Sequence, residues 1–214
     1  MGFTPSKAEP DIWMRPNGDA YECIGVYVDD LAIVVRNPGE IANILQSKYN
    51  FKLKGTGPIT FHLGMDFFRD SDGVLCIAAR KYMEKMVMTY EQHFGSKPSQ
   101  KFSSPLEAGD HPEVDSSEFL DVTETQLYQS LIGTLQWAVS IGRFDITTAV
   151  MTLSGFRTMP RRGHLDCVRR VYGYLSKMKD AMIRVHTAEP DYSGLPYQAF
   201  DWAQTVYGDV SKIL

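Results

Sequence analysis

The chain has 214 residues, of which 43% are hydrophobic, 12% aromatic and 22% charged, and its formal net charge is −4. This composition excludes a wholly disordered chain and is sufficient for one domain, or two small ones, with a hydrophobic core. No apolar run approaches the ~18 residues of a membrane-spanning helix, and the N-terminal segment lacks the apolar stretch of a secretory signal. We therefore expect no membrane partner and an intracellular location, in the cytoplasm or the nucleus.

The first predicted element is a β-hairpin whose two apolar runs, residues 21–27 and 31–35, flank Val28, Asp29 and Asp30. Adjacent carboxylates beside buried strands cost free energy, because like charges repel each other and desolvation is expensive. A hard divalent cation removes both penalties, since it takes oxygen ligands. The pattern predicts a hairpin that presents Asp29 and Asp30 to a metal, and the alternative is a solvated hairpin tip.

The next segments predict further helices and strands. Pro38 suits the first turn of a helix that runs to about Lys48. Two strands, 59–69 and 74–78, are expected around a turn at residues 70–73. Residues 80–94 fit a helix whose apolar stripe consists of Met83, Met86, Val87, Tyr90 and Phe94.

The segment that follows differs sharply in charge from the C-terminal part of the chain. Residues 102–128 carry seven acidic side chains and no lysine or arginine, whereas residues 161–185 carry seven basic and two acidic ones. Because residues 95–122 are also rich in Ser, Pro and Gly, we expect an acidic linker there. A basic region after it could attract phosphates.

Three helices are predicted beyond the linker. Thr123 and Gln126 form a capping-box pattern that would open the first helix, and Asp145 could cap the second. The third follows Pro160, with Leu165, Val168, Tyr172 and Leu175 on one side. The opposite side carries four basic residues, which either track a nucleic-acid backbone or form an ordinary solvated face. They are Arg162, Arg169, Arg170 and Lys177.

Several phrases of the sequence occur together in one family. They are YVDD at residues 27–30, GFTPSKAEPDIW at 2–13, FKLKGTGPITFHLGMDF at 51–67, YQSLIGTLQWAVSIGRFDITTAVMTLS at 128–154 and PRRGHLDCVRRVYGYLSKMKD at 160–180. Over roughly residues 2–185, in the same order and spacing, the chain resembles the copia-type retrotransposon reverse transcriptases.

This resemblance implies an α+β fold. The expected architecture is a partial polymerase palm, built of antiparallel β-hairpins with packed helices, followed by a mostly helical thumb or connection region. Residues 1–94 would form the C-terminal part of the palm, 95–122 the acidic linker and 123–185 the helical region. Residues 186–214 would be a tail leading toward an RNase H domain.

The resemblance also implies RNA-directed DNA synthesis, in which two Mg²⁺ or Mn²⁺ ions promote nucleotidyl transfer. Asp29 would be a direct metal ligand, and Asp30 a second ligand or a structural support. Tyr27 would lie near the primer end, and Leu63 with Gly64 would form the primer grip. Lys54 would lie near the departing pyrophosphate, unless it is an ordinary surface lysine. The expected partners are an RNA or DNA template-primer, a deoxynucleoside triphosphate and the rest of a polyprotein.

The chain also departs from a complete polymerase of this family. The family's other catalytic carboxylate and its fingers are expected upstream of the hairpin, in sequence that residues 1–28 do not provide. We therefore expect an internal fragment that is inactive alone. The alternative is a co-opted, non-catalytic protein that binds nucleic acid or another protein through the basic helix.

Overall fold

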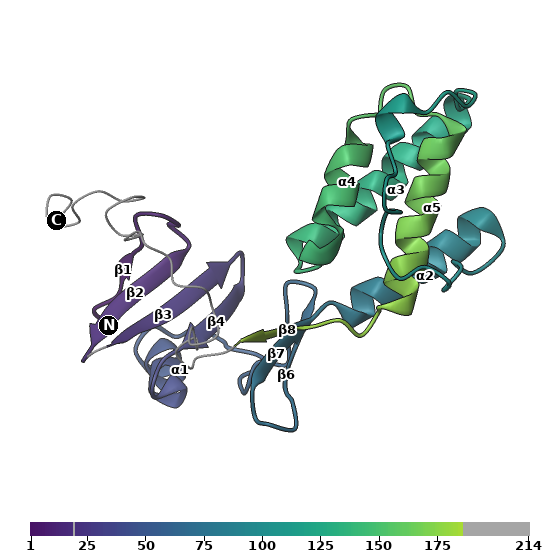
Figure 1. Cartoon of the computed structure of the whole chain (residues 1–214). Helices are drawn as coiled ribbons and strands as arrows, with labels where there is room; N and C mark the ends of the chain where they lie inside the picture. Colours follow the sequence, from purple (N-terminus) through teal and green to yellow (C-terminus); the bar gives the residue numbers. More distant parts are fainter. Residues whose placement is uncertain (19, 186–214) are drawn as a thin grey trace, which may run out of the picture.

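The structure is a computed structural model that describes residues 1–18 and 20–185. Within this part it contains two four-stranded antiparallel sheets and five α-helices (Figure 1). The mixed α+β class predicted from the sequence is confirmed. None of the helices in these residues is both long and apolar enough to cross a membrane.

The first sheet has the strand order β1-β2-β3-β4 and contains the predicted hairpin. Its strands are β1 (Thr4–Pro5), β2 (Ile12–Asn17), β3 (Ala20–Tyr27) and β4 (Asp30–Val34). Helix α1 (Pro38–Ser47) follows it, as predicted, with Pro38 in its first turn. The Asn37 side chain caps α1 by accepting a hydrogen bond from the Glu40 backbone N–H.

The second sheet joins segments from both halves of the chain. It has the order β5-β6-β7-β8, with β5 (Phe61–His62), β6 (Met65–Arg69), β7 (Leu75–Ala78) and β8 (Ile183–Val185). The strand predicted over residues 59–69 is interrupted by a turn at Leu63 and Gly64. Strand β8 was not predicted. It pairs with β7, and the Arg184 guanidinium binds the carboxylates of Asp70 and Asp72.

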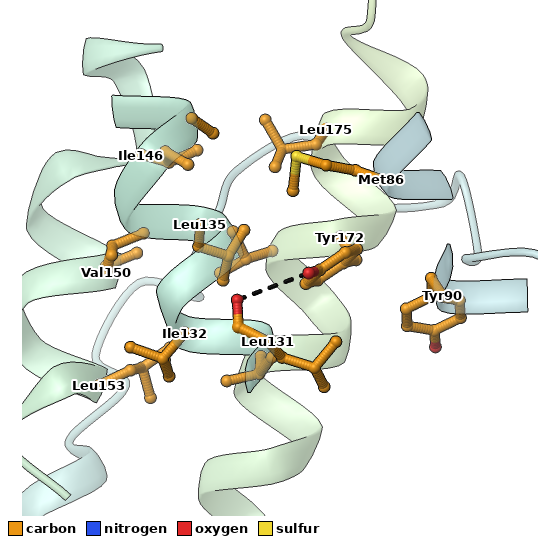
Figure 2. Packing of buried hydrophobic residues seen from close by; sticks show 14 of the residues in the cluster. Met86, Tyr90, Leu131, Ile132, Leu135, Ile146, Val150, Leu153, Tyr172 and Leu175 are labelled. Atoms are coloured by element: carbon orange, nitrogen blue, oxygen red, sulfur yellow. Dashed lines mark hydrogen bonds between the residues drawn. The ribbon is translucent and has the colours of Figure 1, made fainter. Parts of the chain in front are cut away.

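The remaining helices form the core of the molecule. They are α2 (Arg80–Phe94), α3 (Val122–Ser140), α4 (Thr147–Ser154) and α5 (Arg162–Lys177). Buried side chains from all four make one cluster, in which the Tyr172 hydroxyl donates to the Leu131 carbonyl oxygen (Figure 2). Met83, Met86 and Tyr90 of α2 are buried in this cluster. Although the predicted boundaries group α2 with the N-terminal region, it packs among the C-terminal helices.

Two predicted helix caps are wrong. Helix α3 begins at Val122, and its capping box is formed by Asp121 and Glu124 instead of Thr123 and Gln126. Asp145 caps no helix, because it lies inside a short 3₁₀ helix (Phe144–Ile146) and pairs with Arg143. In the first case the neighbouring Asp121 and Glu124 have the same capping-box spacing as the predicted pair, and in the second Asp145 is used by Arg143.

The segment between α2 and α3 is folded against the start of α5. His164, 3% exposed, stacks on the Phe156 ring. Its Nδ1 accepts from the Arg161 backbone N–H, and Nε2 lies 2.8 Å from the Pro112 carbonyl oxygen. This pattern assigns the proton to Nε2, which donates to Pro112. A buried histidine therefore fixes residues 112–114, a short 3₁₀ helix, onto α5.

Glu22 is a buried carboxylate in the middle of the first sheet. It accepts hydrogen bonds from the Arg36 backbone N–H, the Arg15 guanidinium and the Asn17 side-chain amide. These donors, the Arg36 N–H first among them, lower the pKa of Glu22 to about 2 from its ordinary 4.5. The stabilisation from this carboxylate is therefore complete above pH 4.5 and is lost as the pH falls from 4.5 through 2.

We expect Glu22→Gln to be less stable than the wild type at neutral pH and nearly as stable at low pH. The reason is that protonation removes from the wild type the same charge that the substitution removes. Urea unfolding midpoints of both proteins, measured between neutral pH and pH ~2.5, check this. A difference between the two midpoints that does not shrink on acidification would contradict it.

Candidate functional site

The predicted metal ligands lie at the tip of the β3–β4 hairpin. Tyr27 pairs with Asp30, so Val28 and Asp29 form the two-residue turn between the strands. All four side chains are exposed, and Val28 is 87% exposed. Asp29 and Asp30 thus lie at a solvated hairpin tip, which was the alternative considered from the sequence. Exposure at the end of a strand pair also leaves them accessible to a bound cation.

The turn contains an unusual backbone conformation. Val28 has φ = 55°, in the left-handed region that β-branched residues avoid. Only the first of the two turn residues has a positive φ, as in the II′-type turns that favour glycine at this place. A strained residue of this kind costs on the order of 1–3 kcal/mol and is most often found at functional sites.

The donor set at the hairpin is partial. Among residues 1–18 and 20–185, no group of three or more His, Cys, Asp or Glu side chains is placed to hold a metal ion. Mg²⁺ is often bound by one or two carboxylates together with waters and substrate phosphates. Asp29 and Asp30 therefore fit part of a magnesium or manganese site, whose other ligands would come from bound phosphates or from another protein segment.

The predicted primer grip is a second tight turn, in the second sheet. His62 pairs with Met65, so Leu63 and Gly64 form the turn between β5 and β6. Both turn residues have positive φ, 50° and 84°, a combination that suits glycine but not leucine. Lys54 is exposed in the segment between α1 and β5. The residues predicted to form the primer grip thus lie in a hairpin turn, and their contact with a primer remains a prediction.

The basic residues at the two ends of the predicted stripe on α5 hold other segments of the chain. The Arg162 guanidinium binds the Glu124 carboxylate at 2.9 Å. Lys177 Nζ donates to the Ser103 hydroxyl oxygen at 2.9 Å. These contacts connect α5 to α3 and to the segment after α2.

The two central arginines of the stripe also have partners within the chain. Arg169 Nε donates to the Tyr90 hydroxyl oxygen at 3.2 Å, which raises the pKa of this arginine. Arg170 binds the Glu107 carboxylate and donates to Ser104, and its guanidinium lies over the Phe102 ring. All four basic side chains therefore contact other parts of the chain: Arg170 and Lys177 contact the acidic segment, and Arg162 and Arg169 contact α3 and α2.

Sequence reasoning missed an ion pair in the loop after α3, formed between the buried Arg143 and the exposed Asp145. Arg143, 3% exposed, donates from Nε and Nη2 to the two carboxylate oxygens of Asp145, at 3.0 and 2.7 Å. The Tyr174 hydroxyl donates to the same carboxylate at 2.9 Å. Burial raises the pKa of Asp145, but Arg143 and Tyr174 outweigh this and lower it overall. The Arg-x-Asp spacing was a signal, but the sequence does not show that Arg143 is buried.

Comparison with known proteins agrees with the resemblance. Residues 1–97 match the family model described as reverse transcriptase (RNA-dependent DNA polymerase). A putative transposon Ty5-1 protein of Saccharomyces cerevisiae is 27% identical over 214 residues, which cover 99% of this chain and 63% of the relative. A retrovirus-related Pol polyprotein from transposon TNT 1-94 of Nicotiana tabacum is 30% identical over 158 residues, covering 70% of this chain and 11% of the relative.

A similar Pol polyprotein, from transposon RE1 of Arabidopsis thaliana, is 26% identical over 177 residues, covering 82% of this chain and 12% of the relative. No solved structure matches the chain. Residues 1–97 belong to the reverse transcriptase family, in its copia type. The chain as a whole is related to retrotransposon Pol polyproteins, and it spans less than two thirds of the length of each of these relatives.

Proposed function

We propose that this chain serves RNA-directed DNA synthesis as the part of a retrotransposon reverse transcriptase that carries the YVDD carboxylates. One observation carries the proposal: Asp29 and Asp30 lie exposed at a strained turn between paired strands, within the segment that matches the family. An ordinary solvated loop gains nothing from a strained valine at positive φ, whereas strained backbone conformations cluster at functional sites.

The roles proposed for the side chains are those that the family resemblance implies. Asp29 binds the cation, and Asp30, paired with Tyr27 across the hairpin, is a second ligand or orients the first. When bound, the Mg²⁺ or Mn²⁺ would supply charge neutralisation at the transferred phosphate. Tyr27, 53% exposed on the same hairpin, would pack against the primer end.

The second hairpin would bind the primer, and the lysine before it would bind the leaving group. The Leu63–Gly64 turn would hold the primer backbone, because two consecutive residues with positive φ bring backbone groups close to a ligand without side-chain obstruction at Gly64. The charge of Lys54 would attract the pyrophosphate that leaves.

Catalysis by this proposal requires a further carboxylate beside Asp29 and Asp30. Two carboxylates cannot hold two metal ions in line, and the described residues bring no third ligand to the hairpin. The remaining carboxylate and the grip on template and incoming nucleotide would come from another segment of the polyprotein. Template-primer, deoxynucleoside triphosphate and the rest of the polyprotein are therefore the proposed partners.

The co-opted binding function receives less support. It would use Arg162, Arg169, Arg170 and Lys177, but each of these side chains contacts another part of the chain. Binding phosphates through them would compete with contacts that join α5 to α2, to α3 and to the acidic segment.

Primer extension on an RNA template, with Mg²⁺ or Mn²⁺, tests whether catalysis depends on another segment of the polyprotein. We expect the chain alone to extend no primer above the background given by Asp29→Asn. Because the substitution is at an exposed turn, both proteins should have the same unfolding midpoint. Extension by the wild type that disappears in Asp29→Asn would show that the chain is a complete polymerase and would overturn the dependence.

A further inference from the structure

The segment between α1 and β5, residues 48–60, has no regular secondary structure and is exposed at all but one position. It belongs to a longer stretch, residues 41–65, that contains no aspartate or glutamate, although the net charge of the whole chain is −4. Three exposed lysines, Lys48, Lys52 and Lys54, lie in this stretch. The chain after α1 therefore carries a local positive charge that attracts anions.

These lysines differ from the basic residues of α5 in having no acidic partner. Within the part of the chain that the structure describes, none of the three forms an ion pair. In contrast, Arg170 of α5 binds the Glu107 carboxylate at 3.3 Å. A lysine without such a partner releases counterions when it binds a phosphate and breaks no contact within the protein. The segment after α1 is therefore better suited to phosphates than the face of α5.

Two exposed aromatic side chains lie among these lysines in the sequence. Tyr49 is 48% exposed and Phe51 is 59% exposed. Lys48 Nζ lies over the Tyr49 ring, 5.6 Å from its centroid. An exposed ring can stack on a nucleobase while a neighbouring cation contacts a phosphate of the same strand. Rings and cations combined in this way are typical of proteins that bind single-stranded nucleic acid.

The backbone of this segment is anchored to the end of α1. The Phe51 N–H donates to the Leu45 carbonyl oxygen at 3.0 Å, and the Lys48 N–H donates to a carbonyl oxygen one residue earlier in the helix. Asn50, between the two rings, has φ = 57°, a conformation that asparagine tolerates better than most residues. Because the backbone is already held, binding a ligand through the rings costs less conformational entropy than binding through a flexible loop.

We propose that residues 48–54 form a binding site for single-stranded nucleic acid. Bases stack on Tyr49 and Phe51, and Lys48 and Lys52 contact phosphates of the same strand. The bases must be unpaired, because a duplex keeps the faces of its bases stacked on one another. An acidic protein segment would meet the lysines but would offer no nucleobase to the rings. The site goes beyond the proposed polymerase function, since it uses neither the YVDD carboxylates nor a metal ion.

Fluorescence anisotropy of a labelled thymidine oligonucleotide of ~15 nucleotides tests the ligand class. The full chain is used, with EDTA present so that no metal ion takes part. We expect saturable binding of the single strand, at least about fivefold tighter than binding of the same strand paired with its complement. Absence of binding, or equally tight binding of the duplex, would overturn the proposal. Poly-glutamate that competes as well as unlabelled oligonucleotide, at equal charge, would overturn the assignment to nucleic acid.

Two variants separate stacking from charge. Phe51→Ala removes a ring and should weaken binding at least about fivefold without changing its salt dependence. Lys52→Ala removes a cation and should reduce the slope of log K against log[salt] by about 0.7, the value for one phosphate contact on a single strand. The matched controls are Phe144→Ala, at a similarly exposed ring, and Lys85→Ala, at an exposed lysine of α2, and both should bind like the wild type.

The result for Phe51→Ala decides the location of the site. Binding by this variant that equals binding by the wild type would overturn the proposal, as would an equal loss in Phe144→Ala. Because the Phe51 side chain is exposed, the variant should have the unfolding midpoint of the wild type. If it does not fold, Tyr49→Ala is judged by the same criterion.

Discussion

Replacing Met86 with alanine is expected to lower the free energy of unfolding by about 2–5 kcal/mol. Met86 is 3% exposed and points from α2 into the cluster shared with α3, α4 and α5 (Figure 2). Truncation removes its buried apolar surface and leaves a cavity that the surrounding helices fill only partly. Urea denaturation followed by circular dichroism measures the loss.

The matched control is Met88→Ala on the same helix. Met88 is 62% exposed, so its replacement should change the free energy of unfolding by less than about 0.5 kcal/mol. Because both substitutions place alanine in α2, they change helix propensity equally. Equal effects of the two would mean that α2 does not pack with the C-terminal helices.

Gly173→Ala should destabilise the protein by about 1–3 kcal/mol, although alanine normally favours a helix over glycine. A Cβ atom at this position of α5 would lie 2.7 Å from Phe102 Cδ2 and closer still to the Ser99 carbonyl oxygen. The backbone of the segment after α2 would have to move away. The glycine is therefore needed for the close approach of that segment to α5.

Gly133→Ala, also in an α-helix, is expected to change the free energy of unfolding in the opposite direction. Gly133 lies in α3, and a Cβ there would meet no atom within 4 Å. This substitution should raise the free energy of unfolding by about 0.5–1 kcal/mol. Thermal unfolding of both variants checks the pair, and stabilisation by Gly173→Ala would contradict the packing of residues 99–102 on α5.

Local patterns were sufficient to predict several elements. The apolar stripe of Met83, Met86 and Tyr90 predicted α2 with its observed bounds, because a 3.6-residue period needs no knowledge of distant partners. The β3–β4 hairpin was equally predictable from two apolar runs around a polar turn. Where two capping patterns overlapped, at Asp121 and Thr123, the sequence alone favoured the wrong one.

Features that depend on contacts between distant segments could not be predicted in this way. Strand β8 has three residues and is a strand only because β7 is available to pair with it. The four basic residues were correctly predicted to lie in a helix, but their acidic and aromatic partners lie in other segments. At the candidate site, the position of Asp29 in a turn was predictable, whereas the positive φ of Val28 was not.

The most direct test of this account is to locate a bound metal ion on the chain. Mn²⁺ added to the isotopically labelled protein broadens NMR signals of nearby groups, and Asp29→Asn and Glu118→Gln provide the test variant and a control at another exposed carboxylate. We predict broadening centred on Val28, Asp29 and Asp30 that is lost in Asp29→Asn and retained in Glu118→Gln. Broadening that is absent from the hairpin, or that persists unchanged in Asp29→Asn, would contradict the assignment of the YVDD carboxylates as metal ligands.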